Sequence, residues 1–335
     1  MTNDSLGAKE PVNQLTDYEA ALYDRGIRLW GVDAQNRLRQ AKVLFIGINS
    51  LMSEIIKNTV LAGIDSITLI DNHIVTIQDL SCHLFLTHDS IGKKRADESV
   101  QSITELNPLV KVHVVDKEIE SIDKEFLQAY TIVCLNAFDL NLVSKFDTFC
   151  REINIPLIAT HSFGLYGFFF SDLSDFEYIK KTEKKEKDQE EPVIEYVNHK
   201  VSFPSFETAM NIQWSKTNPR RTSPLLYALT VLYQFEQSTK SIPSIENPSH
   251  LSKILEIIDG KLSASQMPSS EQEKYLHITN LLIKHQNHEI APTCAVLGGI
   301  VGAEIIKIIS KNNHVLNNIF FYDNTKGTGV VETMN

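Results

Sequence analysis

The sequence predicts an α/β fold built on a mostly parallel, Rossmann-like sheet flanked by helices. From residue 42 onward, apolar runs of strand length alternate with helical patterns, which favours parallel strands joined by crossover helices. A glycine, Gly47, directly follows the first apolar run, as in nucleotide-binding members of this fold class. The chain has 335 residues, of which 42% are hydrophobic, so it can bury a large core.

Local patterns predict the elements in order along the chain. Thr16, with Glu19 three residues later, has the form of a capping box, so a helix is expected from about Asp17 towards Arg25. The other expected elements are helix 33–40, strand 42–48, helix 51–62, strand 66–71, helix 93–106, strands 110–115 and 131–136, helix 140–153, strands 156–160 and 165–172, helices 224–237, 251–258 and 271–286, a last helix from Pro292, and strand 319–322.

A charged segment interrupts this pattern. Residues 180–191 read KKTEKKEKDQEE, with mixed charge and no apolar side chain. Because such a segment cannot offset its ordering entropy by burial, it predicts a mobile loop. We therefore expect one discontinuous domain, residues 1–172 and 206–335, with a charged insertion at 173–205.

Bulk composition excludes several function classes. The net charge of −10 argues against nucleic-acid binding, which depends on clustered basic side chains. Residues 1–14 are polar and lack the order of a secretory signal. The most apolar expected helix, 291–310, is interrupted by Glu304 and Lys307, so no membrane span is expected. The four cysteines are dispersed, which predicts neither a disulfide framework nor a zinc site and fits a reduced, intracellular compartment.

The loop after the first expected strand reads GINSLM from Gly47 to Met52. A phosphate-binding turn would have glycine at 47, 49 and 52, because the second glycine admits the phosphate and the third allows close helix packing. Asn49 and Met52 remove both features. Asp71, at the end of the second expected strand, lies where a ribose-binding acid belongs, although it could equally cap a turn. We therefore expect no nucleotide in this site.

Several motifs resemble one family closely. They are YDRGIRLWG (23–31), VDAQNRLRQAK (32–42), APTCAVLGGIVGAEIIKIIS (291–310) and NNIFFYDNTKGTGVVE (317–332). They resemble the small-subunit family of heterodimeric SUMO-activating enzymes, within the ubiquitin-activating enzymes. The match covers nearly the whole chain, and the first motif is highly specific to enzymes that activate ubiquitin-like proteins.

The resemblance implies that this chain is the inactive half of a pair of ThiF-like adenylation domains. The large catalytic subunit would bind ATP and Mg²⁺, adenylate the SUMO C-terminus and carry the thioester-forming cysteine. No cofactor or metal is then expected in this chain, and its partners would be that large subunit and SUMO. The insertion at 173–205 would lie near the position of the catalytic-cysteine half-domain. Residence in the nucleus, with some in the cytoplasm, follows from the pathway.

This chain departs from the active half's motifs. An Asp-x-Asp pattern becomes DNH from Asp71 to His73, and Asn-Leu-x-Arg-Gln becomes DLSCH, with Cys82 in place of the arginine. The positive charge of Gly-Lys-x-Lys-Ala survives as Arg95. The acid near magnesium survives as Asp139 in NAFD. Gly47, Asp71, Arg95 and Asp139 are therefore interpreted as a vestigial site.

The resemblance also implies that Arg25 reaches across the dimer into the partner's ATP site. Adenylation brings a triphosphate beside a carboxylate, and a guanidinium, which is always charged, can offset their repulsion. Arg28 is a weaker candidate. The alternative is that Arg25 only pairs with Asp24 or another surface acid.

Two further expectations concern side-chain burial. Tyr23, Leu29 and Trp30 are expected to anchor the Arg25 segment. The cysteines at 134, 150 and 294 are expected to be buried, and Cys82 to be the one exposed thiol, with no helix start or base beside it to lower its pKa. No thioester is therefore expected on this chain.

Two other functions stay open at this point. One is a self-dimerising adenylyltransferase of the sulfur-carrier-activating type, although such proteins keep the glycines, the arginine and paired C-x-x-C motifs. The other is a dead-site scaffold that contributes no group to chemistry. Removal of the Arg25 guanidinium separates the scaffold from the subunit that acts in trans.

Overall fold

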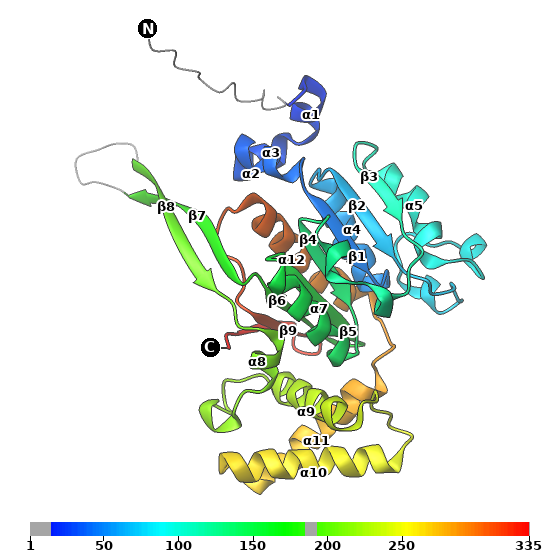
Figure 1. Cartoon of the computed structure of the whole chain (residues 1–335), viewed down its shortest axis with the longest axis vertical. Coiled ribbons are helices and arrows are strands. Elements are labelled where there is room, and N and C mark those ends of the chain that lie inside the picture. The colour runs from blue at the N-terminus through cyan, green and yellow to red at the C-terminus, as the bar shows by residue number, and fades with distance from the viewer. Residues whose placement is uncertain (1–14, 185–192, 335) are drawn as a thin grey trace.

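The computed structural model describes residues 15–184 and 193–334 (Figure 1). Its main sheet has eight strands: β1 Lys42–Ile46, β2 Ser66–Ile70, β3 Lys111–Val114, β4 Ile132–Asn136, β5 Leu157–Phe163, β6 Tyr166–Asp172, β9 Ile319–Asp323 and β10 Thr328–Glu332. The strand order is β10-β9-β6-β5-β4-β1-β2-β3. Strands β1 to β5 pair in parallel, whereas β6, β9 and β10 add an antiparallel edge. The predicted fold class is therefore confirmed.

Helices cover both faces of this sheet (Figure 1). They are α1 Asp17–Leu22, α2 Asp24–Trp30, α3 Val32–Leu38, α4 Ser50–Leu61, α5 Arg95–Leu106, α6 Lys124–Leu127, α7 Leu140–Glu152, α8 Phe206–Met210, α9 Pro224–Thr239, α10 Pro248–Ser265, α11 Gln272–Lys284 and α12 Ala291–Ser310. Successive side chains of β1 point to opposite faces of the sheet, so each face has its own layer of packed helices. Val43 and Phe45 join the core cluster formed with α4 and α12, whereas Leu44 and Ile46 join the cluster formed with α7 and α9.

Helix α12 packs very closely on α4. A Cβ on Gly298 would lie 2.5 Å from the Cβ of Glu54, and one on Gly302 would lie 2.7 Å from the Cβ of Asn58. Only glycine allows this approach. Among the described residues α12 is the one helix long and apolar enough to cross a membrane, and 61% of its apolar window is buried inside the protein, as in a core helix.

The N-terminal helices differ from the expectation in one respect. Thr16 and Glu19 form the predicted capping box. The helix nevertheless ends at Leu22, and a second one, α2, begins at Asp24. The prediction of one helix towards Arg25 is wrong because Tyr23, which separates the two, has a non-helical backbone and turns its side chain into the core.

Strands β7 (Asp175–Lys184) and β8 (Val193–Ser202) form a separate antiparallel ribbon where the insertion was expected. It projects from the body of the molecule (Figure 1). Phe176 and Tyr178 anchor its base, both buried. The predicted loop is wrong for residues 180–184, since backbone pairing to β8 extends the strand where no apolar pattern marks it. The rest of that prediction, like the one for residues 1–14, lies outside the described residues.

Candidate functional site

The vestigial site lies at the point where the strand order reverses. Strand β1 pairs with β2 on one side and β4 on the other, and open α/β sheets bind ligands at the carboxyl ends of such strands. Gly47 has φ +77°, and a Cβ there would lie 2.8 Å from the carbonyl oxygen of Asn136. Glycine is therefore required for the turn itself, whether or not a phosphate binds.

A carboxylate from a distant segment occupies the start of α4. Glu289, just before α12, accepts hydrogen bonds from the backbone N–H of Ser50 at 3.0 Å and of Leu51 at 3.1 Å. Asn49 caps the same helix by accepting from the N–H of Met52 at 3.0 Å. Because a helix N-terminus attracts anions, Glu289 sits where a phosphate would bind. Sequence reasoning missed Glu289, since no local pattern links it to a loop about 240 residues earlier.

Asp71, the acid expected at a ribose position, and Arg95, the expected surviving cation, form an ion pair with each other. Asp71 accepts from the N–H of Ile48 at 2.5 Å and of His73 at 2.8 Å, so the turn-capping interpretation is correct. Arg95 donates to Asp71 at 2.7 Å and to Asp79 at 3.0 Å. Two nearly buried carboxylates thus neutralise Arg95.

Asp79 is held in its charged form by the same cluster. Burial opposes ionisation, but hydrogen bonds from Thr76 and the charge of Arg95 together lower the pKa of Asp79 below its ordinary value. Both the N–H and the hydroxyl of Thr76 donate to Asp79 at 2.7 Å. The lowered pKa of Asp79 thus favours its charged form beside Arg95.

Asp139 serves as a helix cap. It accepts from the N–H of Leu142 at 2.9 Å at the start of α7. Glu236, from α9, accepts from the two N–H groups before that of Leu142, those of Leu140 at 2.8 Å and Asn141 at 3.1 Å. Burial, and then the charge of Asp139, raises the pKa of Glu236 to about 8. Within the described residues no group of three or more potential ligands could hold a metal ion.

These residues do not fit a bound ATP and Mg²⁺. The N–H groups at the start of α4 already hold a carboxylate, and Arg95 already carries two. Met52 is fully buried where the third glycine of a phosphate-binding turn would be. A triphosphate entering this pocket would have to displace Glu289 and separate Arg95 from its partners.

One expectation about the cysteines is wrong. Cys82 is half-buried, and its Sγ lies 3.2 Å from the hydroxyl of Ser50, the first residue of α4. Its pKa is lowered to about 6, first by a hydrogen bond from Cys294 and then by the hydroxyls of Ser50 and Ser81. Sequence reasoning found no helix start beside Cys82, because the contact spans 32 residues. The other three cysteines are buried, as predicted.

Arg25 contrasts with these paired groups. Its side chain is exposed on α2, and among the described residues no hydrogen bond or ion pair engages its guanidinium. Asp24 instead pairs with Arg28 at 3.0 Å, one turn along the helix. The suggested pairing of Arg25 with Asp24 is therefore wrong. Arg28 is the engaged cation of the two.

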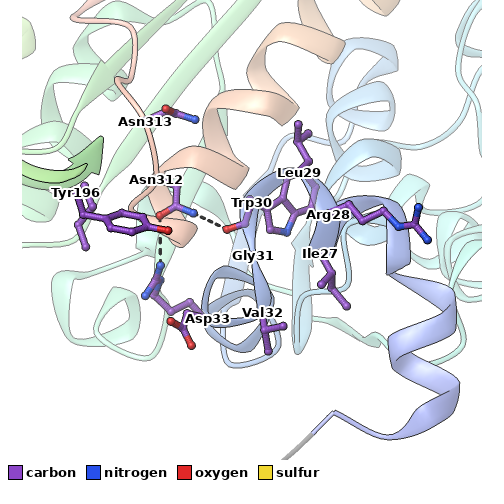
Figure 2. A pocket seen from close by; sticks show the side chains of 12 residues that line it. Ile27, Arg28, Leu29, Trp30, Gly31, Val32, Asp33, Tyr196, Asn312 and Asn313 are labelled. Carbon is purple, nitrogen blue, oxygen red and sulfur yellow. Dashed lines mark hydrogen bonds between the residues drawn. The ribbon is translucent and has the colours of Figure 1, made fainter. Parts of the chain in front are cut away.

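Two of the three expected anchors hold this segment. The hydroxyl of Tyr23 is buried and accepts from the side-chain amide of Asn107 at 2.9 Å. Trp30 is half-buried, and its carbonyl accepts from the side chain of Asn312 at 2.7 Å (Figure 2). Leu29, however, is 79% exposed, so that prediction is wrong. Successive side chains on a helix point about 100° apart, so Trp30 points towards the core whereas Leu29 points to solvent.

Exposed apolar side chains lie on α1, α2 and α3, before and after Arg25 in the sequence. Leu22, Leu29 and Val32 are each about half or more exposed. A surface hollow of about 800 Å³ opens beside Leu29 and Val32, between α2, the start of α3, the ribbon and the segment after α12 (Figure 2). Tyr196 of β8 and Asn313 line its far side. Contiguous exposed apolar surface is typical of interaction sites.

Comparisons with known proteins agree with the sequence resemblance. The ThiF family model matches residues 23–335. SUMO-activating enzyme subunit 1 of Dictyostelium discoideum is 52% identical over 332 residues, covering 99% of this chain and 97% of the relative. The human subunit 1 is 31% identical and covers 96% of each chain. Subunit 1B-1 of Arabidopsis thaliana is 31% identical and covers 96% of this chain and 98% of its own. The chain therefore belongs to the ThiF family and, within it, to the SUMO-activating enzyme subunit 1 proteins.

Proposed function

We propose that this chain is the noncatalytic, regulatory subunit of a heterodimeric SUMO-activating enzyme. Its large partner binds ATP and Mg²⁺, adenylates the SUMO C-terminus and forms the thioester. This chain binds no nucleotide or metal and supplies Arg25 to the partner's ATP site in trans. It acts mainly in the nucleus, with some present in the cytoplasm, which imaging of a tagged chain tests.

One observation carries the proposal: the chain's own anion site is closed by its own Glu289. The carboxylate satisfies the N–H groups of Ser50 and Leu51 that a phosphate would need. Replacing that carboxylate would cost the protein a helix cap. This closure also argues against the self-dimerising adenylyltransferase, because such an enzyme requires a working ATP site in every copy.

The position of Arg25 supports the role in trans. A cation that acts on a neighbour's substrate must be exposed and must not be held by a local acid, and Arg25 meets both conditions. Its backbone is nevertheless held in place, since Tyr23 and Trp30 are anchored on either side. A preorganised guanidinium can stabilise charge that develops during adenylation. Arginines supplied by a second protein act in this way in other phosphoryl chemistry.

The apolar side chains beside Arg25 support a stable partner interface. Leu22, Leu29 and Val32 would be covered when the large subunit docks on α1 to α3. Burial of exposed apolar side chains is the main favourable term in association. Co-expression with a candidate large subunit, followed by size-exclusion chromatography, should give a stable one-to-one complex. A soluble homodimer that ignores the large subunit would overturn this assignment.

The test of the proposed function is the Arg25→Ala variant in ATP–pyrophosphate exchange. We expect the heterodimer to form normally and SUMO adenylation to slow by about 2–4 kcal/mol in activation free energy, the cost of removing one preorganised charge-stabilising donor. Arg28→Ala is the matched control, because Arg28 lies on the same helix but is paired with Asp24. An exchange rate unchanged by Arg25→Ala would support the dead-site scaffold instead.

The absence of a thioester on this chain is a separate prediction. Cys134, Cys150 and Cys294 are buried away from solvent. Cys82 lies in the pocket closed by Glu289, where no SUMO adenylate is expected. After incubation with SUMO, ATP and the large subunit, a non-reducing gel should show the SUMO adduct on the partner alone. An adduct on this chain would contradict the assignment.

A further inference from the structure

Two thiols meet in the closed pocket, although they lie 212 residues apart in the sequence. Cys82 follows the short helical turn Asp79–Ser81, and Cys294 lies in the first turn of α12. Both sulfurs lie beside the Ser50–Glu289 pair that closes the anion site. Cys82 Sγ lies 3.2 Å from the hydroxyl of Ser50, and Cys294 Sγ lies 3.9 Å from a carboxylate oxygen of Glu289. The adenylation chemistry proposed above uses neither thiol.

The two thiols differ in exposure and in pKa, as do the cysteine that reacts first with an oxidant and the cysteine that then forms a disulfide with it. Cys82 is half-buried, so a small oxidant can reach it, whereas Cys294 is fully buried behind it. The pKa of Cys82 is lowered to about 6, so most of it is thiolate at neutral pH. The pKa of Cys294 is raised, first by its hydrogen bond with Cys82 and then by burial. Cys294 therefore keeps its proton while Cys82 is the nucleophile.

The surroundings favour this division of roles. Ser50 is the first residue of α4, so the positive end of that helix faces the Cys82 sulfur. The carboxylate of Glu289 opposes the Cys82 thiolate, and its Oε1 lies 3.9 Å from the Cys294 sulfur. Cys134 and Cys150 are buried in the core, and burial raises the pKa of each thiol above its ordinary value. They serve as unreactive internal references.

We propose that Cys82 is a hydroperoxide-reactive thiol and that Cys294 resolves its oxidised form into an intrachain disulfide. The Cys82 thiolate attacks one oxygen of the hydroperoxide, the O–O bond breaks, and hydroxide or alkoxide leaves as the sulfur becomes a sulfenic acid. The Cys294 sulfur then attacks the Cys82 sulfur and displaces hydroxide, which leaves as water with the Cys294 proton. The peroxide is thereby reduced by two electrons, and the two thiols are oxidised to one disulfide.

The disulfide would join the loop after Asp79–Ser81 to the start of α12 across the closed pocket. It would lie against Ser50 and Glu289, the pair that closes the anion site. The inference depends on this thiol cluster and not on the function proposed for Arg25, so the two can fail independently.

Peptide mapping of the full-length wild-type chain tests the proposal directly. The reduced protein is treated with hydrogen peroxide, free thiols are alkylated, and the unreduced digest is analysed by mass spectrometry. We expect a cross-linked peptide pair that contains Cys82 and Cys294, while Cys134 and Cys150 are recovered as free thiols. Recovery of Cys82 as a free thiol, or its disulfide with a different cysteine, would overturn the proposal.

Two variants separate the reactive from the resolving role. In Cys294→Ser the sulfenic acid on Cys82 should persist and be trapped by dimedone, at least about tenfold more than in Cys82→Ser. The rate of Cys82 alkylation should rise with a midpoint near pH 6, as its lowered pKa requires. Equal dimedone labelling of the two variants, or an alkylation midpoint near that of an ordinary thiol, would contradict the assignment.

Discussion

The pocket at the end of β1 and helix α2, which carries Arg25, differ in how their charged side chains are paired. In the pocket, Arg95 is nearly buried between Asp71 and Asp79, and Glu289 caps α4. On α2, Arg25 is exposed with no partner among the described residues. A buried charge must be paired to be tolerated, whereas an exposed one costs little when unpaired. Substitutions in the pocket should therefore change stability, and substitution of Arg25 should change activity.

Arg95→Ala should show the largest effect on stability. It leaves Asp71 and Asp79 uncompensated, and removal of one partner from a buried ion pair costs about 3–5 kcal/mol. Urea unfolding monitored by circular dichroism measures this loss. Lys111→Ala is the control, because the Lys111–Asp65 pair is largely exposed and should contribute about 1 kcal/mol or less. Equal losses in the two variants would remove the contrast between buried and exposed charge.

The buried carboxyl of Glu236 should make the free energy of unfolding depend on pH. Its pKa is raised from 4.5 to about 8 by burial, so the folded state keeps its proton at pH values where the unfolded state has lost it. The stability that it contributes is complete below about pH 4.5 and is lost as the pH rises to about 8. The free energy of unfolding should fall across this window, by up to about 1.4 kcal/mol per pH unit for one group.

Glu236→Gln should reduce that slope. Asp147, whose pKa burial and Asp172 raise to about 8, should sustain part of the slope in the variant. Urea unfolding at several pH values between 5 and 8 compares the two proteins. A slope that is unchanged in Glu236→Gln would show that Glu236 does not hold its proton in the folded state.

Glu289→Ala should lower stability less than Arg95→Ala, but it should create a site that binds anions. Loss of the cap on α4 should cost about 1 kcal/mol. The freed N–H groups should then take up an anion, so inorganic phosphate should raise the Tm of the variant more than that of the wild type. Glu246→Ala, at an exposed position, is the control. A variant of unchanged stability that ignores phosphate would show that Glu289 does not close the site.

Much of the fold could be predicted because its signals are local. Apolar periodicity predicted strands β1 to β6 and β9 and the long helices α4, α5, α7 and α9 to α12, with boundaries shifted by a few residues, as at Ile46. The short helices α6 and α8 were not predicted. The outer part of the ribbon could not be predicted, since Lys180–Lys184 is held by backbone pairing that leaves no apolar pattern. Strand β10 was missed for a related reason, because most of its residues are exposed at the edge of the sheet.

The site could be predicted only in part. The structure brings Gly47, Asp71 and Arg95 together at one pocket, since Gly47 and Asp71 directly follow β1 and β2 and Arg95 is the first residue of α5. Other contacts at the site were not found, since the contact of Glu289 with Ser50 spans 239 residues and that of Cys82 with Ser50 spans 32. Leu29 was assigned to the core from its residue type alone, although single exposed apolar side chains are common on protein surfaces.

The central claim is that this chain's own pocket is closed and that its arginine serves a neighbour's pocket. Equilibrium dialysis with labelled ATP, on this chain alone and on its complex with the large subunit, tests it most directly. We expect no saturable binding to the chain alone and one nucleotide per heterodimer. Saturable binding to the isolated chain, or two nucleotides per heterodimer, would contradict the claim.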